Sequence, residues 1–153
     1  MSYDPLSPQE ILARYRDGDV TPVPVQQIVM DLGVDLVFVP GGGCYIENSE
    51  YGFQMNIDSL WDASEQRIAM ARMLEYVLFN PNAYTHRFNA YTKGGGAITD
   101  FMVDLLVPDD VIAPLVPPGI PGKRFIRTMA NVFCVHEQVV NARLKRLAQT
   151  NPT

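Results

Sequence analysis

The side chains best suited to hold a metal ion are scarce in this chain of 153 residues. It contains two histidines, His86 and His136, and two cysteines, Cys44 and Cys134. Zinc sites in proteins are built mainly from histidine and cysteine in short motifs. These four residues do not form such a motif, so we expect no metal and no cofactor. The cysteines are expected to be small core residues with reduced thiols.

Two glycine triplets, at positions 41–43 and 94–96, raise the question of a phosphate-binding loop. Such loops follow the patterns G-x-x-x-x-G-K-[ST] or G-x-G-x-x-G, because backbone amides must surround the phosphates at defined positions. Neither triplet fits these patterns. We therefore predict flexible turns at both triplets, and no nucleotide site.

Basic residues are concentrated near the end of the chain, where Glu137 is the single carboxylate between positions 123 and 146. Within an acidic protein, this asymmetry is typical of a contact surface for nucleic acid or for an acidic protein. The alternative is that the helices carrying these residues pack on the core and leave only a solvated face. The candidate basic surface consists of Lys123, Arg124, Arg127, Arg143, Lys145 and Arg146.

The composition is that of one globular domain. Hydrophobic residues make up 47% of the chain and charged residues 19%, which is enough apolar material for a core and excludes global disorder. A net charge of −5 argues against a dedicated nucleic-acid coat or a polybasic membrane binder. No signal peptide or membrane span is recognisable. We expect a cytoplasmic protein with no membrane association.

Apolar periodicity predicts a helix, a small sheet and then more helices. The strands fall within 34–57, after a helix that begins near Pro24, and the longest helix is expected from Ala63 to Phe79. Segregated helices and strands favour an α+β domain. A single domain would cover residues 1–153, with an N-terminal extension at 1–22 and a C-terminal helical module at 122–150. Further helices are predicted at 97–106, 123–135 and 136–149, and a helical turn at 108–113.

Several segments share the spacing of one known family. Asp31-Leu32-Gly33-Val34 ends the first long helix, Met55-Asn56-Ile57 ends the sheet, and Phe101–Pro108 keeps a hydrophobic run closed by Leu-Leu-x-Pro. On these residues the chain resembles the ImmA/IrrE-type zinc metallopeptidases, which cut phage repressors and other DNA-binding regulators. The resemblance implies a zincin-like fold, with helices packed on a mostly antiparallel three-stranded sheet and a C-terminal helix-turn-helix-like pair. That last segment contributes Ala130, Phe133, Val135, His136, Val140, Arg143, Leu144 and Leu147.

The catalytic motif of the resembled family is degenerate in this chain. In a His-Glu-x-x-His motif, two histidines on one helix face bind zinc and the glutamate polarises the metal-bound water. Arg72, Met73 and Tyr76 occupy these places, and none of them can do those jobs. Glu75 lies one position from the second histidine place, and the family's acidic third ligand would fall in the stretch 93–97, which has no carboxylate. The chain is therefore expected to be a pseudo-peptidase.

A remnant cleft would be lined by Arg72, Met73, Glu75, Tyr76, Asp100 and Asp104. One interpretation is that Arg72 and Tyr76 anchor an acidic peptide or a partner's carboxylate. The other, which we favour from the sequence, is that Arg72 forms an internal ion pair with Glu75, Asp100 or Asp104. A possible binding loop beside the cleft carries Tyr84, His86, Phe88 and Tyr91.

The sequence favours a catalytically inactive regulatory protein that binds a protein partner. By family analogy that partner is a helix-turn-helix transcriptional repressor of a phage or mobile element. Two alternatives stay open: an active metallopeptidase or toxin with unconventional residues, and a DNA-binding regulator that uses the basic C-terminal helices. The sequence does not decide the oligomeric state.

Overall fold

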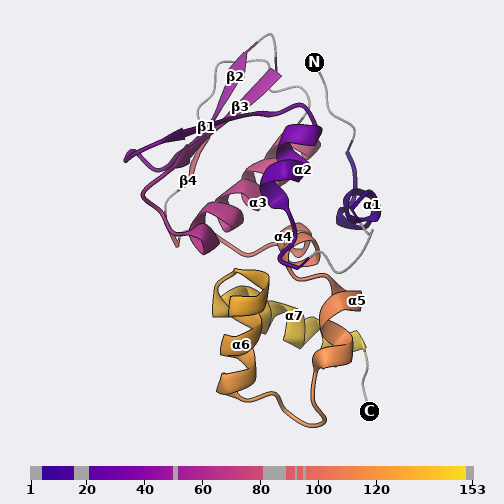
Figure 1. Ribbon diagram of the computed structural model, residues 1–153. Helices are drawn as coiled ribbons and strands as arrows, with labels where there is room; N and C mark the ends of the chain where they lie inside the picture. Colours follow the sequence, from indigo (N-terminus) through magenta and orange to yellow (C-terminus); the bar gives the residue numbers. More distant parts are fainter. Residues whose placement is uncertain are drawn as a thin grey trace.

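The computed structural model describes residues 5–15, 21–49, 52–80, 89–91, 93–94 and 96–150. These residues form an α+β fold, as the segregated pattern predicts, with a small sheet on one side and helices stacked beneath it (Figure 1). The helices are α1 (Pro8–Ala13), α2 (Val25–Asp31), α3 (Ala63–Phe79), α4 (Asp100–Leu106), α5 (Asp109–Ile112), α6 (Lys123–Phe133) and α7 (Glu137–Thr150). A 3-10 turn, η1 (Ala113–Leu115), follows α5.

The sheet is mixed: two of its three strand pairings are antiparallel, in line with the expectation, and one is parallel. Its strands are β1 (Asp35–Val39), β2 (Cys44–Ser49), β3 (Gly52–Asp58) and β4 (Asn89–Tyr91), in the spatial order β1-β3-β2-β4. β2 and β3 form an antiparallel hairpin, but β1 lies parallel to β3, with Val37 opposite Asn56. The alternation of apolar residues within 34–57 predicts strands but does not say which strand takes the centre. The short β4 lies in a stretch that we expected to be a loop, and it pairs with β2.

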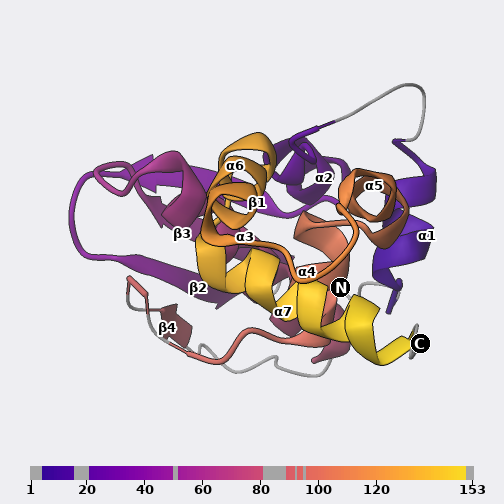
Figure 2. The ribbon, with the colours of Figure 1, turned by 90° about the horizontal axis from the view of Figure 1, so that it is seen from below.

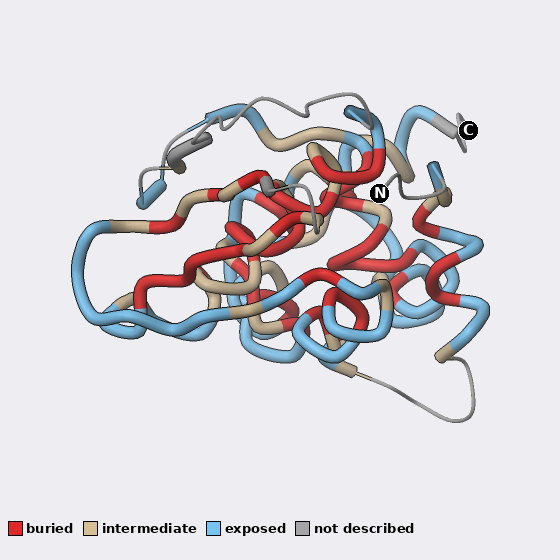
Figure 3. Tube along the Cα trace, turned by 90° about the horizontal axis from the view of Figure 1, so that it is seen from above, coloured by how far each residue is buried: buried red, intermediate tan, exposed pale blue. Residues whose placement is uncertain are grey.

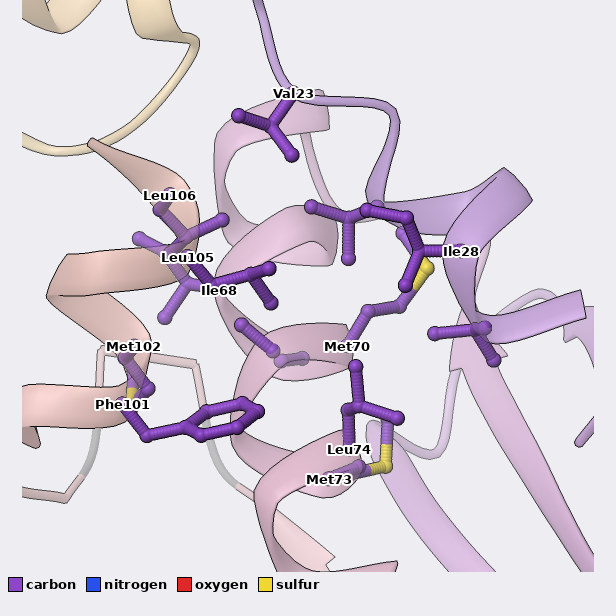
Figure 4. Packing of buried hydrophobic residues seen from close by; sticks show 14 of the residues in the cluster. Val23, Ile28, Ile68, Met70, Met73, Leu74, Phe101, Met102, Leu105 and Leu106 are labelled. Carbon is purple, nitrogen blue, oxygen red and sulfur yellow. The ribbon is translucent and has the colours of Figure 1, made fainter. Parts of the chain in front are cut away.

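Helix α3 runs through the middle of the molecule and carries much of the core. Asp62 caps its N-terminus by accepting a hydrogen bond of 2.9 Å from the Glu65 backbone N–H. Its apolar side chains pack between α4 and α2, as Figure 4 shows for Ile68 and Leu74. Seen from above, the buried part of the trace lies inside a rim of exposed residues (Figure 3).

Helix α7 runs along the underside of the molecule, below α4 (Figure 2). Arg67 of α3 ties this C-terminal part to the rest of the chain. Its Nε donates to the Cys134 carbonyl at 3.1 Å, its Nη2 to the Phe133 carbonyl at 3.3 Å, and its Nη1 to the Val23 carbonyl at 2.6 Å. One guanidinium thus satisfies carbonyls at the end of α6 and before α2.

The predicted helices are found with small shifts at their ends. The helix expected at 97–106 begins at Asp100, because Thr99 takes the capping position and its Oγ1 accepts from the Met102 N–H at 3.3 Å. Helices α6 and α7 are joined through Cys134, whose φ of 53° ends α6 in the left-handed region. No helix in the described part of the chain is long and apolar enough to cross a membrane.

Candidate functional site

One face of α3 lies toward the segment after β4. Glu65, Ala69, Arg72 and Tyr76 are spaced by four, three and four residues, which places them along one side of a helix. Arg72 is partly buried and lines two pockets. Arg72 and Tyr76, which the sequence places one turn apart on a cleft-lining face, both line the second of these pockets.

The first pocket lies between the start of α3, the segment 94–98 and the start of α7. It holds about 20 Å³, which is room for a single water molecule. His136 Nε2 lies 2.6 Å from Glu65 Oε1, and the Gly94 N–H donates to Glu65 Oε2 at 3.3 Å. The described lining residues are Trp61, Glu65, Ile68, Ala69, Arg72, Gly94, Gly96, Ile98, His136, Gln138 and Val139.

The second pocket lies between the end of α3 and β4 and has a volume of about 360 Å³. The guanidinium carbon of Arg72 lies 5.7 Å from the centroid of the Tyr91 ring, within the range of a cation–π contact. Burial raises the pKa of the Tyr91 phenol, and the nearby Arg72 charge opposes that shift without cancelling it. Tyr91 is therefore a neutral hydrogen-bonding group at neutral pH. Described lining residues are Arg72, Glu75, Tyr76, Phe79, Asn80 and Tyr91.

Gly96 brings the chain unusually close to Arg72. A Cβ atom at position 96 would lie 3.1 Å from Arg72 Cζ and 3.3 Å from its Nη2. Gly96 also has a φ of 86°, which side-chain-bearing residues rarely adopt. The guanidinium thus lies close to the Gly96 backbone and within cation–π range of the Tyr91 ring.

The predicted internal ion pair of Arg72 is wrong. Glu75 Oε1 accepts from Thr99 Oγ1 at 2.9 Å, which leaves this carboxylate tied to the start of α4. Asp100 forms an ion pair with Arg146. Asp104 pairs with Arg143 at 2.6 Å. In the described residues no carboxylate forms an ion pair with Arg72, because α7 supplies the cations that these aspartates face.

Met73, Asp100 and Asp104 do not belong to the cleft, contrary to the sequence prediction. Met73 is fully buried in the core beside Leu74 (Figure 4). The reason is helical geometry, because a residue one position after Arg72 is turned by about 100° around the axis. Glu65, Gly96 and His136 were missed as site residues. The signal for Glu65 was its distance of seven residues from Arg72, which is two helical turns.

Within the described residues, no three histidine, cysteine or acidic side chains gather closely enough to hold a metal ion. Both cysteines are free thiols, Cys44 in the core and Cys134 at the end of α6. Two backbone amides of the first glycine triplet already have a partner within the protein. The N–H groups of Gly41 and Gly43 donate to the buried Asp58 carboxylate at 2.9 and 3.0 Å, so these amides already bind an anion supplied by β3.

The predicted basic surface divides into two parts. Arg143 is buried, and its Nε donates to the Val107 carbonyl at 2.8 Å while its Nη2 meets Asp104. Arg146 is partly buried and faces the exposed Asp100, so both arginines bridge α7 and α4, but only Arg143 does so in the interior. Lys123, Arg124, Arg127 and Lys145 are exposed, although Arg127 Nε lies 3.7 Å from Glu137 Oε1.

Of the possible binding loop, Tyr91 lies at the second pocket as described, whereas Tyr84, His86 and Phe88 lie outside the described residues. The fold and the site define an α+β protein with an arginine held between two pockets beside its central helix. No protein-family model matches this chain, and a search of curated proteins finds no match.

Proposed function

We propose that this protein is a non-catalytic protein-binding domain whose Arg72 anchors an acidic segment of a partner. The observation that carries the proposal is the position of Arg72 between two pockets, without an ion-pair partner among the described carboxylates. A partly buried guanidinium gains more from a carboxylate than an exposed one does, because less solvent screens the pair.

The surroundings of Arg72 hold its guanidinium in one place before a partner arrives. Gly96 leaves no room for a side chain beside the guanidinium, and the Tyr91 ring lies 5.7 Å away. A side chain that is already ordered loses less conformational entropy on binding. The phenol of Tyr91 and that of Tyr76 add hydrogen-bonding groups at the second pocket, which suits a polar peptide.

The identity of the partner is inferred from the resemblance to the ImmA/IrrE-type metallopeptidases. Members of the resembled family act on helix-turn-helix repressors, and here Arg72, Met73 and Tyr76 stand at the motif positions. A protein that kept the binding cleft and lost the chemistry would hold such a regulator without cutting it. We therefore propose a cytoplasmic regulatory protein, encoded on a phage or mobile element, that binds a transcriptional repressor.

The anchoring role is tested with fluorescent peptides that differ only in charge, one rich in glutamate and one in which glutamine replaces glutamate. Fluorescence anisotropy with the wild type should show tighter binding of the glutamate peptide, despite the net charge of −5. Arg72→Gln should weaken that binding by about tenfold or more, since one charge-assisted contact is worth at least ~1.4 kcal/mol.

Lys145→Gln is the matched control, because it removes the same charge from an exposed site on α7. It should leave the affinity for the glutamate peptide within about twofold of the wild type. Equal weakening by both variants would mean that general charge attracts the peptide, and the Arg72 proposal would then be wrong. The same conclusion would follow if wild type did not distinguish the two peptides.

A second candidate function is binding of duplex DNA by the start of α6. It is supported by the exposed Lys123 and Arg124, which lie in a stretch, 111–136, without a carboxylate. Phosphate contacts would make the affinity fall steeply with salt. A duplex that shifts in a gel at low salt with wild type, and not with Lys123→Gln/Arg124→Gln, would support it. No shift at low salt would remove this candidate.

A further inference from the structure

Strand β1 lies at one edge of the sheet and has a neighbour on one side only. It pairs with β3, and in the part of the chain that the structure describes no strand or loop backbone bonds to its outer edge. Alternate backbone N–H and C=O groups of such a strand point outward and can pair with another extended chain. Four of the five residues of β1 are exposed.

This edge is unusually apolar for one that faces water. Val37 is 37% exposed, Phe38 41% and Val39 44%, so three consecutive hydrophobic residues are accessible. Leu60 is 75% exposed and follows Ser59, whose N–H donates to the Val39 carbonyl at 3.1 Å. Soluble proteins usually protect edge strands with lysine, an internal proline or a bulge. β1 has none of these, and its one charged residue is Asp35.

We propose that two copies of this chain associate by pairing their β1 strands antiparallel, which joins two small sheets into one. The match between the strand and itself selects a second copy as the occupant. With Val37 opposite Val37 of the other copy, Leu36 faces Phe38 and Asp35 faces Val39. The apolar side chains then form one continuous patch on each face of the joined sheet.

Charge fixes the direction of the pairing. In the antiparallel arrangement the two Asp35 residues lie about 14 Å apart along the strands, beyond the ~10 Å screening length at 0.1 M salt. In a parallel arrangement the same two carboxylates would face each other across the strand spacing of about 5 Å, which destabilises the pair. The sequence of β1 thus suits antiparallel association with itself.

The oligomeric state in solution tests the proposal. Sedimentation velocity of the full chain at about 1–100 µM should show a dimer. Two paired strands of five residues each form a small interface, for which we expect a micromolar Kd. Val37→Lys should shift the population to monomer, with at least about a tenfold rise in Kd. Ile120→Lys is the matched control, because Ile120 is 97% exposed and lies between η1 and α6, away from β1.

The dimer should persist in Ile120→Lys. A monomeric wild type over this range would overturn the proposal and would leave the edge to an extended segment of another protein. A dimer that survives Val37→Lys with unchanged Kd would also overturn it. Far-ultraviolet circular dichroism of both variants checks that each remains folded.

Disulfide trapping tests the register independently of stability. In a Cys134→Ser background, Val37→Cys should form a disulfide-linked dimer under mild oxidation, because facing Cα atoms in antiparallel strands are about 4.5–5.5 Å apart. Ile120→Cys in the same background should not. Failure of Val37→Cys to cross-link, or equal cross-linking by Ile120→Cys, contradicts the proposed pairing.

Discussion

His136 Nε2 lies 2.6 Å from Glu65 Oε1, and this contact joins the residue before α7 to the first turn of α3. Glu65 is 7% exposed and also accepts from the Gly94 backbone. One carboxylate therefore holds together three segments that are far apart in the sequence. Because these segments line the first pocket, the contact also fixes the position of its walls.

This contact should appear as a coupling free energy in a double-mutant cycle of Glu65→Gln and His136→Gln. Each single variant should lose about 1–2 kcal/mol of unfolding free energy in urea, and the pair should lose less than the sum by about 0.5 kcal/mol or more. Losses that add within ~0.3 kcal/mol would show that the two side chains contribute independently.

Gly96→Ala should disturb Arg72, since the new Cβ would lie 3.1 Å from its Cζ atom. Gly94→Ala is the control, because Gly94 has a similar φ of 70° and no heavy atom within 4 Å of the added Cβ. Both variants should lose about 1–2 kcal/mol of stability from the left-handed backbone. Only Gly96→Ala should also weaken binding of the glutamate peptide, measured by fluorescence anisotropy. Equal peptide affinities in the two variants would contradict a role for this contact.

Arg143→Met should be strongly destabilising, because it removes a buried guanidinium that serves Asp104 and the Val107 carbonyl. We expect chemical denaturation to show a loss of about 3 kcal/mol in the free energy of unfolding. This is at the lower end of the range for breaking a buried ion pair, because Asp104 is partly exposed. Lys145→Met changes an exposed residue on the same helix and should change stability by less than about 0.5 kcal/mol. Similar losses of unfolding free energy in the two variants would contradict the role of Arg143 as a buried bridge.

Asp58→Asn should reduce the dependence of the protein's stability on pH in the acid range. Burial raises the pKa of Asp58, but backbone donors from Leu60, Gly43 and Gly41 outweigh it, and the folded-state pKa lies below the usual value. A lowered folded pKa contributes stability above the unfolded pKa near 3.9, and this contribution is lost as the pH falls through the folded pKa.

Thermal melts of the wild type should therefore show a falling Tm below about pH 4, with a smaller change for Asp58→Asn. The variant should also melt at a lower temperature at pH 7, because the amide has one acceptor oxygen in place of two for the Gly41 and Gly43 donors. An acid profile identical in the two proteins would mean that Asp58 does not titrate as described.

Local features of the sequence determined the long helices and the strands β1, β2 and β3, but not the short β4. The period of apolar residues predicted α3 from Ala63 to Phe79, which are its bounds in the structure. Likewise, the spacing of Arg72 and Tyr76 predicted that they share a face, because the helical period alone fixes that relation. The α+β class followed from the order of the elements, which any one sequence displays.

Only the tertiary structure decided which distant residues meet. Asp100 and Asp104 could have faced Arg72 or α7, and the docking of α7 beneath α4 gave them Arg146 and Arg143. The same docking brought His136 to Glu65, although 71 positions separate them. β1 lies at the edge of the sheet because it pairs with the free side of β3, whose other side is paired with β2. No local sequence pattern encodes that choice. Charged side chains and strand edges pair with the groups that tertiary packing brings next to them. Their partners are therefore properties of the fold rather than of the local sequence.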